Sequence, residues 1–358
     1  MFKHYDEDRS FVDKSTALSD YLAPFMALPR QGSAQWLANR CKTIGGSEMS
    51  ILEGTNPYKD LKGLVMVKLG WDKFEGNIAT NWGKVFEPVT QRILELLFKC
   101  ELFESGSLPG CIEGTSYSPD GFAVVLKDTI TDLISKGWIE DHELPEESAV
   151  CILFEIKSPY KRIPNGIVPI MYMSQPKSGL CHFPFVDIAY FVDVAYRKCS
   201  CDAESDAYDN DFHKDKMILQ NHFTYGFIGI YNKNASYDVT SVPLNYGNIR
   251  YYGMLEMTNN IDNRTWAIWM GEPHWDIDNQ DEIIAIDSEW FAEFCEKNDY
   301  SAIGHMMYKG YLINILPVQR DPDFVQNLAP EVRKVLSVVD KVKKAANQQE
   351  EFDKIFTL

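Results

Sequence analysis

The chain has 358 residues, of which 45% are hydrophobic, and a formal net charge of −17. This composition supplies a sizeable core and excludes an intrinsically disordered chain. No apolar run approaches the ~20 residues that a membrane helix needs. The charged start of the chain also lacks the apolar stretch of a signal peptide. We therefore expect an intracellular protein that is not secreted and does not use a membrane as a partner.

The acidic balance bears on one class of partner in particular. Proteins that bind nucleic acid usually carry a surplus of basic residues, so a net charge of −17 argues against such binding at first sight. Net charge averages over the whole surface, however, whereas binding depends on the charge of a local groove. An acidic exterior around a basic inner track remains compatible with a nucleic-acid substrate.

The cysteines give little indication of a metal site. Eight are scattered along the chain and no CxxC pair occurs, so a zinc ribbon or finger is not expected. A site made of Cys199, Cys201, His182 and His213 stays open as an alternative to free thiols in a reducing compartment.

The first predicted elements are helical. A helix over Ala34 to Arg40 is followed by a Gly45-Gly46 break and a second short helix, for which Ser47 is a suitable N-cap. The clearest helix spans residues 83–100, because its apolar side chains follow helical spacing. Proline is tolerated in the first turn of a helix, so Pro88 places Glu87 at the helix entrance.

Strands follow. The string SPDG, Ser118 to Gly121, predicts a tight turn before a strand through residues 122–126. Residues 127–149 are polar and acidic, and we expect them to form an insertion between paired strands. The string FEIKSP, Phe154 to Pro159, overlaps a strand over residues 151–156, in which Glu155 and Lys157 share one side.

The rest of the chain completes the fold prediction. We expect a strand over 184–196, a β-rich region over 224–270, and helices over 288–297 and 329–347, the last packing on the core or on another subunit. Strands mixed with helices indicate an α/β fold with a β-rich C-terminal elaboration. The predicted organisation is an N-terminal extension (1–29), a core (30–200) and a C-terminal elaboration (201–358) packed on that core as one compact domain.

Two charged residues on one side of an apolar strand indicate a functional site. A Glu-x-Lys pair on a strand is usually a solvated face, and SPDG alone is a common turn. Here the strand is otherwise apolar, so both charges are expected to face inward, where an unpaired charge is costly. Phosphodiester hydrolysis needs an activated water and a neutralised phosphate, which one or two Mg²⁺ ions held by hard oxygen ligands can supply.

These residue types therefore predict a metal-dependent phosphodiester nuclease. Asp120, Glu155 and the backbone carbonyl of Ile156 are the expected metal ligands, and Glu87 is a third carboxylate that acts directly or through water. Lys157 lies on the same strand side as Glu155, where it can orient the attacking water or offset charge on the phosphate.

At this point the motifs resemble a known family. The chain is similar to the lambda-type, or YqaJ-like, exonucleases of the PD-(D/E)xK nuclease superfamily, which occur in phages and in large DNA viruses of eukaryotes. The resemblance runs from about Arg40 to Gln175, and five ordered segments carry it: RCKTIGGSE, NWGKVFEP, SYSPDG, FEIKSP and YMSQ. It implies a restriction-endonuclease-like core in which a central mixed sheet is flanked by helices.

The resemblance also implies an activity. It implies a Mg²⁺-dependent 5′→3′ exonuclease, with Mn²⁺ as a substitute ion, that digests one strand of linear double-stranded DNA for recombination, repair or replication of a viral genome. Glu87, Asp120, Glu155 and Lys157 would form the catalytic and metal group. A single-strand annealing or recombination protein would be a partner, an oligomer is open, and the location would be the host cytoplasm or nucleus.

A second set of residues matches positions that hold a terminal 5′ phosphate. These are Arg40, Ser47, Ser118 and Gln175, and an arginine fork with hydroxyl or amide donors suits a phosphate dianion. Pro176 follows Gln175 and is expected to disturb its helix, so Lys177 is an alternative DNA-backbone contact.

Two other functions remain open at this level. One is an endonuclease or repair nuclease on the same core, which differs by cutting covalently closed circular DNA. The other is a non-catalytic scaffold that binds DNA ends. The intact Asp120, Glu155 and Lys157 argue against the scaffold.

Overall fold

The fold is taken from a computed structural model, which describes residues 8–25, 28, 34–72, 78–103, 105–199, 223–232, 266–275 and 279–356. Cys201, His213 and most of the expected β-rich region before residue 266 lie outside the described residues. The described helices include none that is both long enough and apolar enough to cross a membrane.

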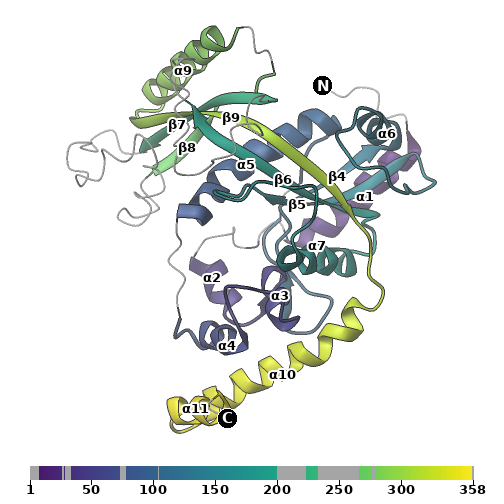
Figure 1. The fold of residues 1–358 in the computed structure, drawn as a ribbon, viewed down its shortest axis with the longest axis vertical. Helices are drawn as coiled ribbons and strands as arrows, with labels where there is room; N and C mark the ends of the chain where they lie inside the picture. The colour runs from purple at the N-terminus through teal and green to yellow at the C-terminus, as the bar shows by residue number, and fades with distance from the viewer. Residues whose placement is uncertain are drawn as a thin grey trace.

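A six-stranded mixed sheet forms the centre of the molecule (Figure 1). Its strand order is β4-β5-β6-β9-β7-β8. Only β5 and β6 pair in parallel, and the other neighbours are antiparallel. The strands are β4 (Gly121–Leu126), β5 (Ala149–Lys157), β6 (Ile188–Cys199), β7 (Thr224–Asn232), β8 (Trp266–Met270) and β9 (Ser301–Val318).

Helices α5 (Ile78–Phe98) and α6 (Lys127–Ser135) cover one face of this sheet. The apolar stripe of α5, with Phe86, Val89 and Ile93 fully buried, packs against the side of β5 that carries Ile152, Phe154 and Ile156. Burial of such side chains is the main favourable term in folding. The alternation expected for this strand is therefore confirmed.

The opposite face is covered by α1 (Arg9–Leu22) and α7 (Ile170–His182). Leu18 and Leu180 pack there against Leu153, which is on the same side of β5 as Glu155. Lys14 of α1 also pairs with Asp187 at 2.5 Å, just before β6. A short 3₁₀ helix, η2 (Ala23–Phe25), ends this N-terminal segment.

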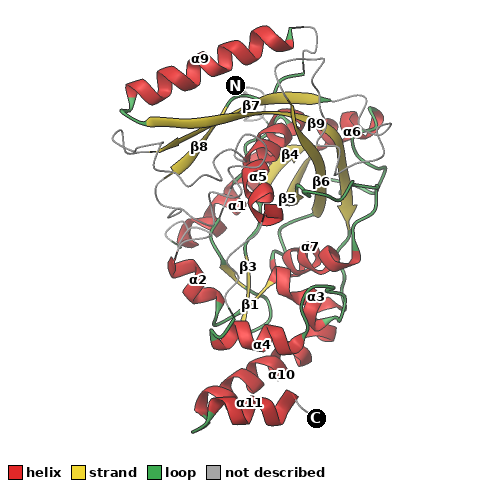
Figure 2. Cartoon of the chain, turned by 60° about the vertical axis from the view of Figure 1, so that its left-hand side comes forward, coloured by secondary structure: helices red, strands yellow, loops and turns green. Residues whose placement is uncertain are grey.

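A smaller unit lies beside the sheet and packs against α7 (Figure 2). It contains the three-stranded sheet β1-β3-β2, a 3₁₀ turn and three short helices. Its elements are α2 (Ala34–Arg40), β1 (Ile44–Gly45), η3 (Gly46–Glu48), α3 (Met49–Leu52), α4 (Leu61–Leu69), β2 (Leu108–Pro109) and β3 (Thr115–Tyr117).

The helices of the C-terminal part of the chain lie at opposite ends of the molecule (Figure 1). Helix α9 (Gln280–Lys297) packs on β7 and β9 at one end, through Phe291 and Cys295. Helix α10 (Phe324–Lys344) carries its buried valines onto α3, α4 and α7 at the other end, and α11 (Gln348–Phe356) folds back on it.

The mixed α/β class expected from the sequence is confirmed, but three expected helix starts were wrong. Helix α9 begins at Gln280 and not at 288, and α10 begins at Phe324 and not at 329. Helix α5 begins at Ile78, so Pro88 lies inside it and not in its first turn. Proline removes only the backbone hydrogen bond that would end on the carbonyl of Lys84, and burial of the apolar stripe maintains the helix. The expected division into extension, core and elaboration stays a prediction.

Candidate active site

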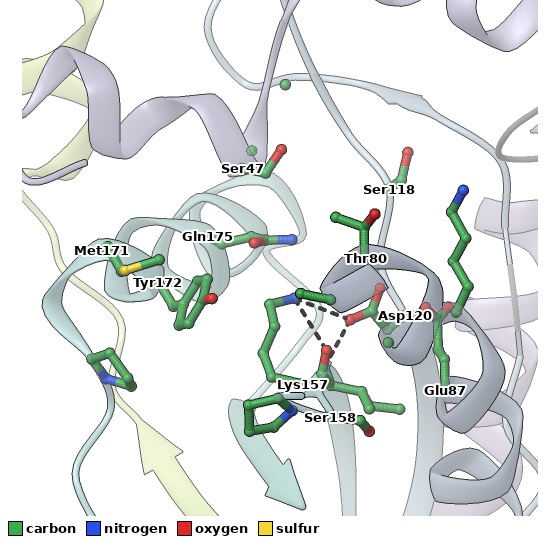
Figure 3. A pocket seen from close by; sticks show the side chains of 18 of the residues that line it. Ser47, Thr80, Glu87, Ser118, Asp120, Lys157, Ser158, Met171, Tyr172 and Gln175 are labelled. Carbon is green, nitrogen blue, oxygen red and sulfur yellow. Dashed lines mark hydrogen bonds and ion pairs between the residues drawn. The ribbon is translucent and has the colours of Figure 1, made fainter. Parts of the chain in front are cut away.

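A cavity of about 1040 Å³ lies between α5, α7, the end of β5 and the 45–47 turn. Its lining brings together most of the residues singled out from the sequence (Figure 3). They are Arg40, Ser47, Glu87, Ser118, Asp120, Ile156, Lys157 and Gln175. Glu155 lies fully buried directly behind this lining, because its neighbours Ile156 and Lys157 form part of the wall.

The sheet brings Asp120 and Glu155 together. Strands β4 and β5 pair with Gly121 opposite Phe154, so the residue before β4 meets the end of β5. Asp120 Oδ2 accepts a hydrogen bond of 2.7 Å from the backbone N–H of Ile156. From α5, the Gln91 side chain donates to the backbone carbonyl of Asp120 at 2.8 Å. Both the side chain and the main chain of Asp120 are therefore fixed.

Lys157 lies among the acidic groups. Its ammonium pairs with Glu155, is 3.8 Å from Asp120 Oδ2, and donates to the carbonyl of Ile156 at 3.1 Å. Burial works to lower the pKa of Lys157, but Glu155, Asp120 and Glu87 outweigh burial and raise it. The lysine is thus held in its charged form, and Figure 3 shows it pointing toward Asp120.

Glu155 is the most strongly perturbed carboxylate of the site. Burial first, and then the negative charge of Asp120, raises its pKa to about 8, although Lys157 and Tyr117 oppose the shift. The Tyr117 hydroxyl donates to Glu155 Oε2 at 3.0 Å. A further cation beside this carboxylate would favour its ionised form.

The donor set fits a divalent metal ion. Two carboxylates and the Ile156 carbonyl converge on one cation, the Lys157 ammonium, and these are hard oxygen ligands of the kind that Mg²⁺ prefers. Within the described parts of the chain, no cluster of three or more His, Cys, Asp or Glu side chains is arranged to hold a metal. Glu87 lies on α5 at the cavity wall.

The predicted phosphate-binding residues line the same cavity. Arg40 donates to Ser47 Oγ at 2.7 Å, and its guanidinium is 5.0 Å from the centre of the Trp36 ring. Ser118 and Gln175 line the same cavity, from the turn before β4 and from α7. Figure 3 shows Ser47, Ser118 and Gln175 around one side of the hollow.

Two local expectations about these residues were wrong. Ser47 is not an N-cap, because Gly45 occupies that position and the Glu48 side chain accepts the Gly45 N–H. Pro176 does not interrupt the helix around Gln175, since α7 continues to His182. Pro176 loses only the hydrogen bond that would end on the carbonyl of Tyr172, and its buried ring adds packing.

Close packing holds the 45–47 turn against β3, and α7 against β5. A Cβ on Gly46 would lie 2.5 Å from the Tyr117 ring, and one on Gly179 of α7 would lie 2.3 Å from Leu153. Both positions therefore require glycine. Tyr117 contacts Glu155 with its hydroxyl and Gly46 with its ring, so it connects Glu155 with the 45–47 turn.

Sequence reasoning did not single out several residues of the site. Tyr172 lies beside two cations: the centre of its ring is 5.7 Å from Lys157 Nζ and 5.9 Å from the Arg162 guanidinium carbon. Arg162 forms a two-bond fork of 2.5 and 2.8 Å with the buried Asp193 of β6. The signal for Asp193 was a lone carboxylate in the apolar strand 188–196.

The charge of the lining differs from that of the whole chain. Its ionisable residues are five basic and two acidic side chains, namely Arg40, Lys84, Lys157, Lys161 and Arg162 against Glu87 and Asp120. The acidic residues of 127–149 do not line it. Lys177 does not line it either, and pairs with Asp321 at 2.9 Å before α10.

Comparisons with known proteins agree with the motifs. Residues 35–178 match the family described as the YqaJ-like viral recombinase domain. The chain is 24% identical to a protein of African swine fever virus, and the alignment covers 94% of each protein. The same protein from another isolate of that virus is also 24% identical.

Solved structures give weaker likenesses. An alkaline exonuclease from Laribacter hongkongensis is 14% identical, with 75% of this chain and 94% of that chain covered at a TM-score of 0.33. Its complex with dAMP is 12% identical at a TM-score of 0.32, with 74% and 97% covered.

The family match spans all five motifs and every residue proposed for the site. Over residues 35–178 the chain is therefore similar to the YqaJ-like viral recombinase domain, as the motifs indicated.

Proposed function

We propose that this protein is a Mg²⁺-dependent 5′→3′ exonuclease that digests one strand of linear double-stranded DNA from a 5′-phosphorylated end. The observation that carries the proposal is that one cavity brings two groups of residues together. Asp120 and Lys157 line it with Glu155 buried directly behind, and Arg40, Ser47, Ser118 and Gln175 line the same cavity. Such an enzyme would prepare single-stranded DNA for recombination, repair or replication of a viral genome.

The residues have separate roles in this proposal. Asp120, Glu155 and the Ile156 carbonyl would hold the metal ion, with Glu87 acting directly or through water on a second one. The ion supplies a Lewis acid and a water of lowered pKa. Lys157, held charged by its neighbours, orients the attacking water and offsets charge that develops on the phosphate. Mn²⁺ is expected to replace Mg²⁺.

The terminal phosphate would give direction to the reaction. A phosphate monoester carries about −1.5 to −2 charges at neutral pH, more than an internal diester, so a guanidinium beside hydroxyl and amide donors favours the chain end. Binding the 5′ end there would place the first internal phosphodiester toward the acidic centre. The partners of this enzyme would be DNA ends and, after digestion, a single-strand annealing protein.

The test is release of nucleotides from a linear duplex with and without Mg²⁺. We expect Asp120→Asn, Glu155→Gln and Lys157→Ala each to abolish cleavage while the protein still folds and binds DNA. Asp187→Asn is the matched control, because Asp187 also accepts a backbone N–H of β5, from Cys151 at 2.7 Å, but lies away from the cavity. Full activity in any of the three site variants would contradict the mechanism.

Two further substrates test direction and end recognition. Removal of the 5′ phosphate should slow digestion, and Arg40→Ala should erase this difference; equal rates on both ends for the unmodified protein would refute the phosphate site. Covalently closed circular DNA should resist digestion, whereas its cleavage would favour an endonuclease. Metal-dependent binding without any cleavage would favour a non-catalytic scaffold.

A further inference from the structure

A buried ion pair lies next to the segment that carries Arg40 and Ser47, two residues of the cavity lining. Lys68 of α4 and Glu48 are 1% and 8% exposed, and their Nζ and Oε2 atoms are 2.6 Å apart. Neither side chain lines the cavity. The pair is therefore separate from the catalytic centre and contributes nothing to binding by direct contact.

The pair closes a ring of hydrogen bonds around residues 40–48, which we name the phosphate arm. Glu48 Oε2 accepts the backbone N–H of Gly45 at 2.7 Å, and Lys68 donates to the backbone carbonyl of Arg40 at 2.8 Å. Both ends of the arm are thus attached to one ammonium group. Within the arm, the Arg40 side chain donates to Ser47 Oγ at 2.7 Å.

Stability alone does not account for such a pair. Burial lowers the pKa of Lys68, and Glu48 offsets this only in part. Buried ion pairs are often no more stabilising than apolar side chains of the same volume, because both charges lose their hydration. Apolar side chains, however, could not donate to the Arg40 carbonyl or accept from the Gly45 N–H.

We infer that Glu48 and Lys68 are positioning residues that fix the Arg40 guanidinium relative to Ser47 Oγ, and thereby give the site its preference for a 5′-phosphate over a 5′-hydroxyl end. This inference rests on the proposed function. Recognition of a phosphate dianion by an arginine fork depends on donor geometry, so an arm free to shift would lose discrimination before it lost cleavage.

The experiment compares digestion of 5′-phosphorylated and 5′-hydroxyl duplexes by Glu48→Gln, Lys68→Met and the double variant. Glutamine can still accept the Gly45 N–H, so Glu48→Gln should lose part of the preference. Lys68→Met loses the contact with Arg40 and should reduce the ratio of the two rates about tenfold, equivalent to about 1.4 kcal/mol. The rate on hydroxyl ends should stay close to that of the unmodified protein.

Two measurements make the result decisive. Fluorescence anisotropy without a divalent cation should show the same loss of preference in binding, independently of cleavage. Lys14→Met removes a more exposed ion pair, between Lys14 of α1 and Asp187, away from the arm, and should leave the ratio unchanged. Thermal unfolding identifies variants that do not fold. If Lys68→Met does not fold, the double variant replaces it in the comparison, because it leaves no unpaired charge buried.

The outcomes separate the two proposals. A fall of both rates by the same factor in a folded Lys68→Met or double variant would overturn the inference and leave the pair a purely structural role. Equal rates on both ends for the unmodified protein would instead refute the 5′-phosphate site itself. Loss of the ratio in Lys14→Met would also count against a specific role for Glu48 and Lys68.

Discussion

At the level of single residues, Glu155 shows how the environment determines chemistry. It has no exposed surface, and burial together with Asp120 raises its pKa to about 8. Its two oxygens have different partners, the Lys157 ammonium on Oε1 and the Tyr117 hydroxyl on Oε2. The Tyr117 hydroxyl therefore helps to set the orientation of this carboxylate.

This arrangement predicts the effect of Tyr117→Phe. The variant keeps the ring that packs on Gly46 but removes the hydroxyl that donates to Glu155. Loss of a partner that orients a metal ligand typically weakens metal affinity or activity by about 10- to 100-fold. We expect the Mg²⁺ concentration for half-maximal digestion to rise within this range, measured by titrating the ion at saturating DNA.

Tyr190→Phe provides the comparison. Tyr190 is also a buried tyrosine with a side-chain partner, His142 at 2.9 Å, but it does not line the cavity. An unchanged Mg²⁺ requirement in Tyr117→Phe, or an equal change in both variants, would show that the hydroxyl does not orient Glu155.

Residue-scale prediction from the sequence succeeded where a residue type was out of place. Charged side chains in an apolar strand and an aspartate in a turn indicated Glu155, Lys157 and Asp120, and the structure brings all three together. Glu48, Lys68 and Tyr117 gave no such signal. Their importance depends on contacts between segments 20 to 38 positions apart, which no local pattern encodes.

At the level of elements, α7 carries Gln175 near its first turns and His182 at its last residue. Burial lowers the pKa of His182 to about 4, and its Nδ1 atom has no hydrogen-bond partner among the described residues. The folded protein therefore keeps this histidine neutral at a pH where the unfolded chain already binds a proton.

The consequence is a dependence of stability on pH. Because the pKa of His182 is lower in the folded state than the ordinary value of 6.5, its effect on stability is absent well above pH 6.5. As the pH falls from 6.5 toward 4, the free energy of unfolding should decrease by at most about 1.4 kcal/mol per pH unit.

The measurement is thermal unfolding between pH 8 and pH 4. In His182→Phe, which cannot titrate, we expect a smaller drop in melting temperature across this range than in the unmodified protein. His142→Phe is a control at a histidine outside α7. Parallel curves for His182→Phe and the unmodified protein would rule out a contribution from this residue.

Element boundaries were harder to predict than element types. Both prolines, Pro88 and Pro176, were expected to limit helices, yet each lies inside one. Local propensity assigns a cost of about 3 kcal/mol to such a proline. Burial of a whole helix face outweighs this cost, and the amount of burial becomes known only when the helix packs on the sheet.

At the level of the whole molecule, charge is unevenly distributed. The chain carries a net charge of −17, whereas the cavity lining has five basic and two acidic side chains. The sequence left open whether an acidic protein could bind DNA, because composition carries no information about which charges share a surface. Electrostatic attraction for DNA should be confined to the cavity.

This distribution predicts a modest dependence of DNA binding on salt. Each neutralised phosphate contributes about −0.9 to the slope of log K against log salt concentration. With five basic residues in the lining, we expect a slope no steeper than about −4.5 for a short duplex, measured by anisotropy without a divalent cation. A markedly steeper slope would reveal a basic track elsewhere on the protein.

The pairing of β4 with β5 has a consequence for heat inactivation. Asp120 and Glu155 are brought together by the ladder that places Gly121 opposite Phe154, and not by a flexible loop. Their separation therefore persists for as long as these two strands stay paired in their native register. Heating should abolish catalysis and melt the sheet in one transition, so residual activity can serve as a direct count of molecules whose central strands are still in register.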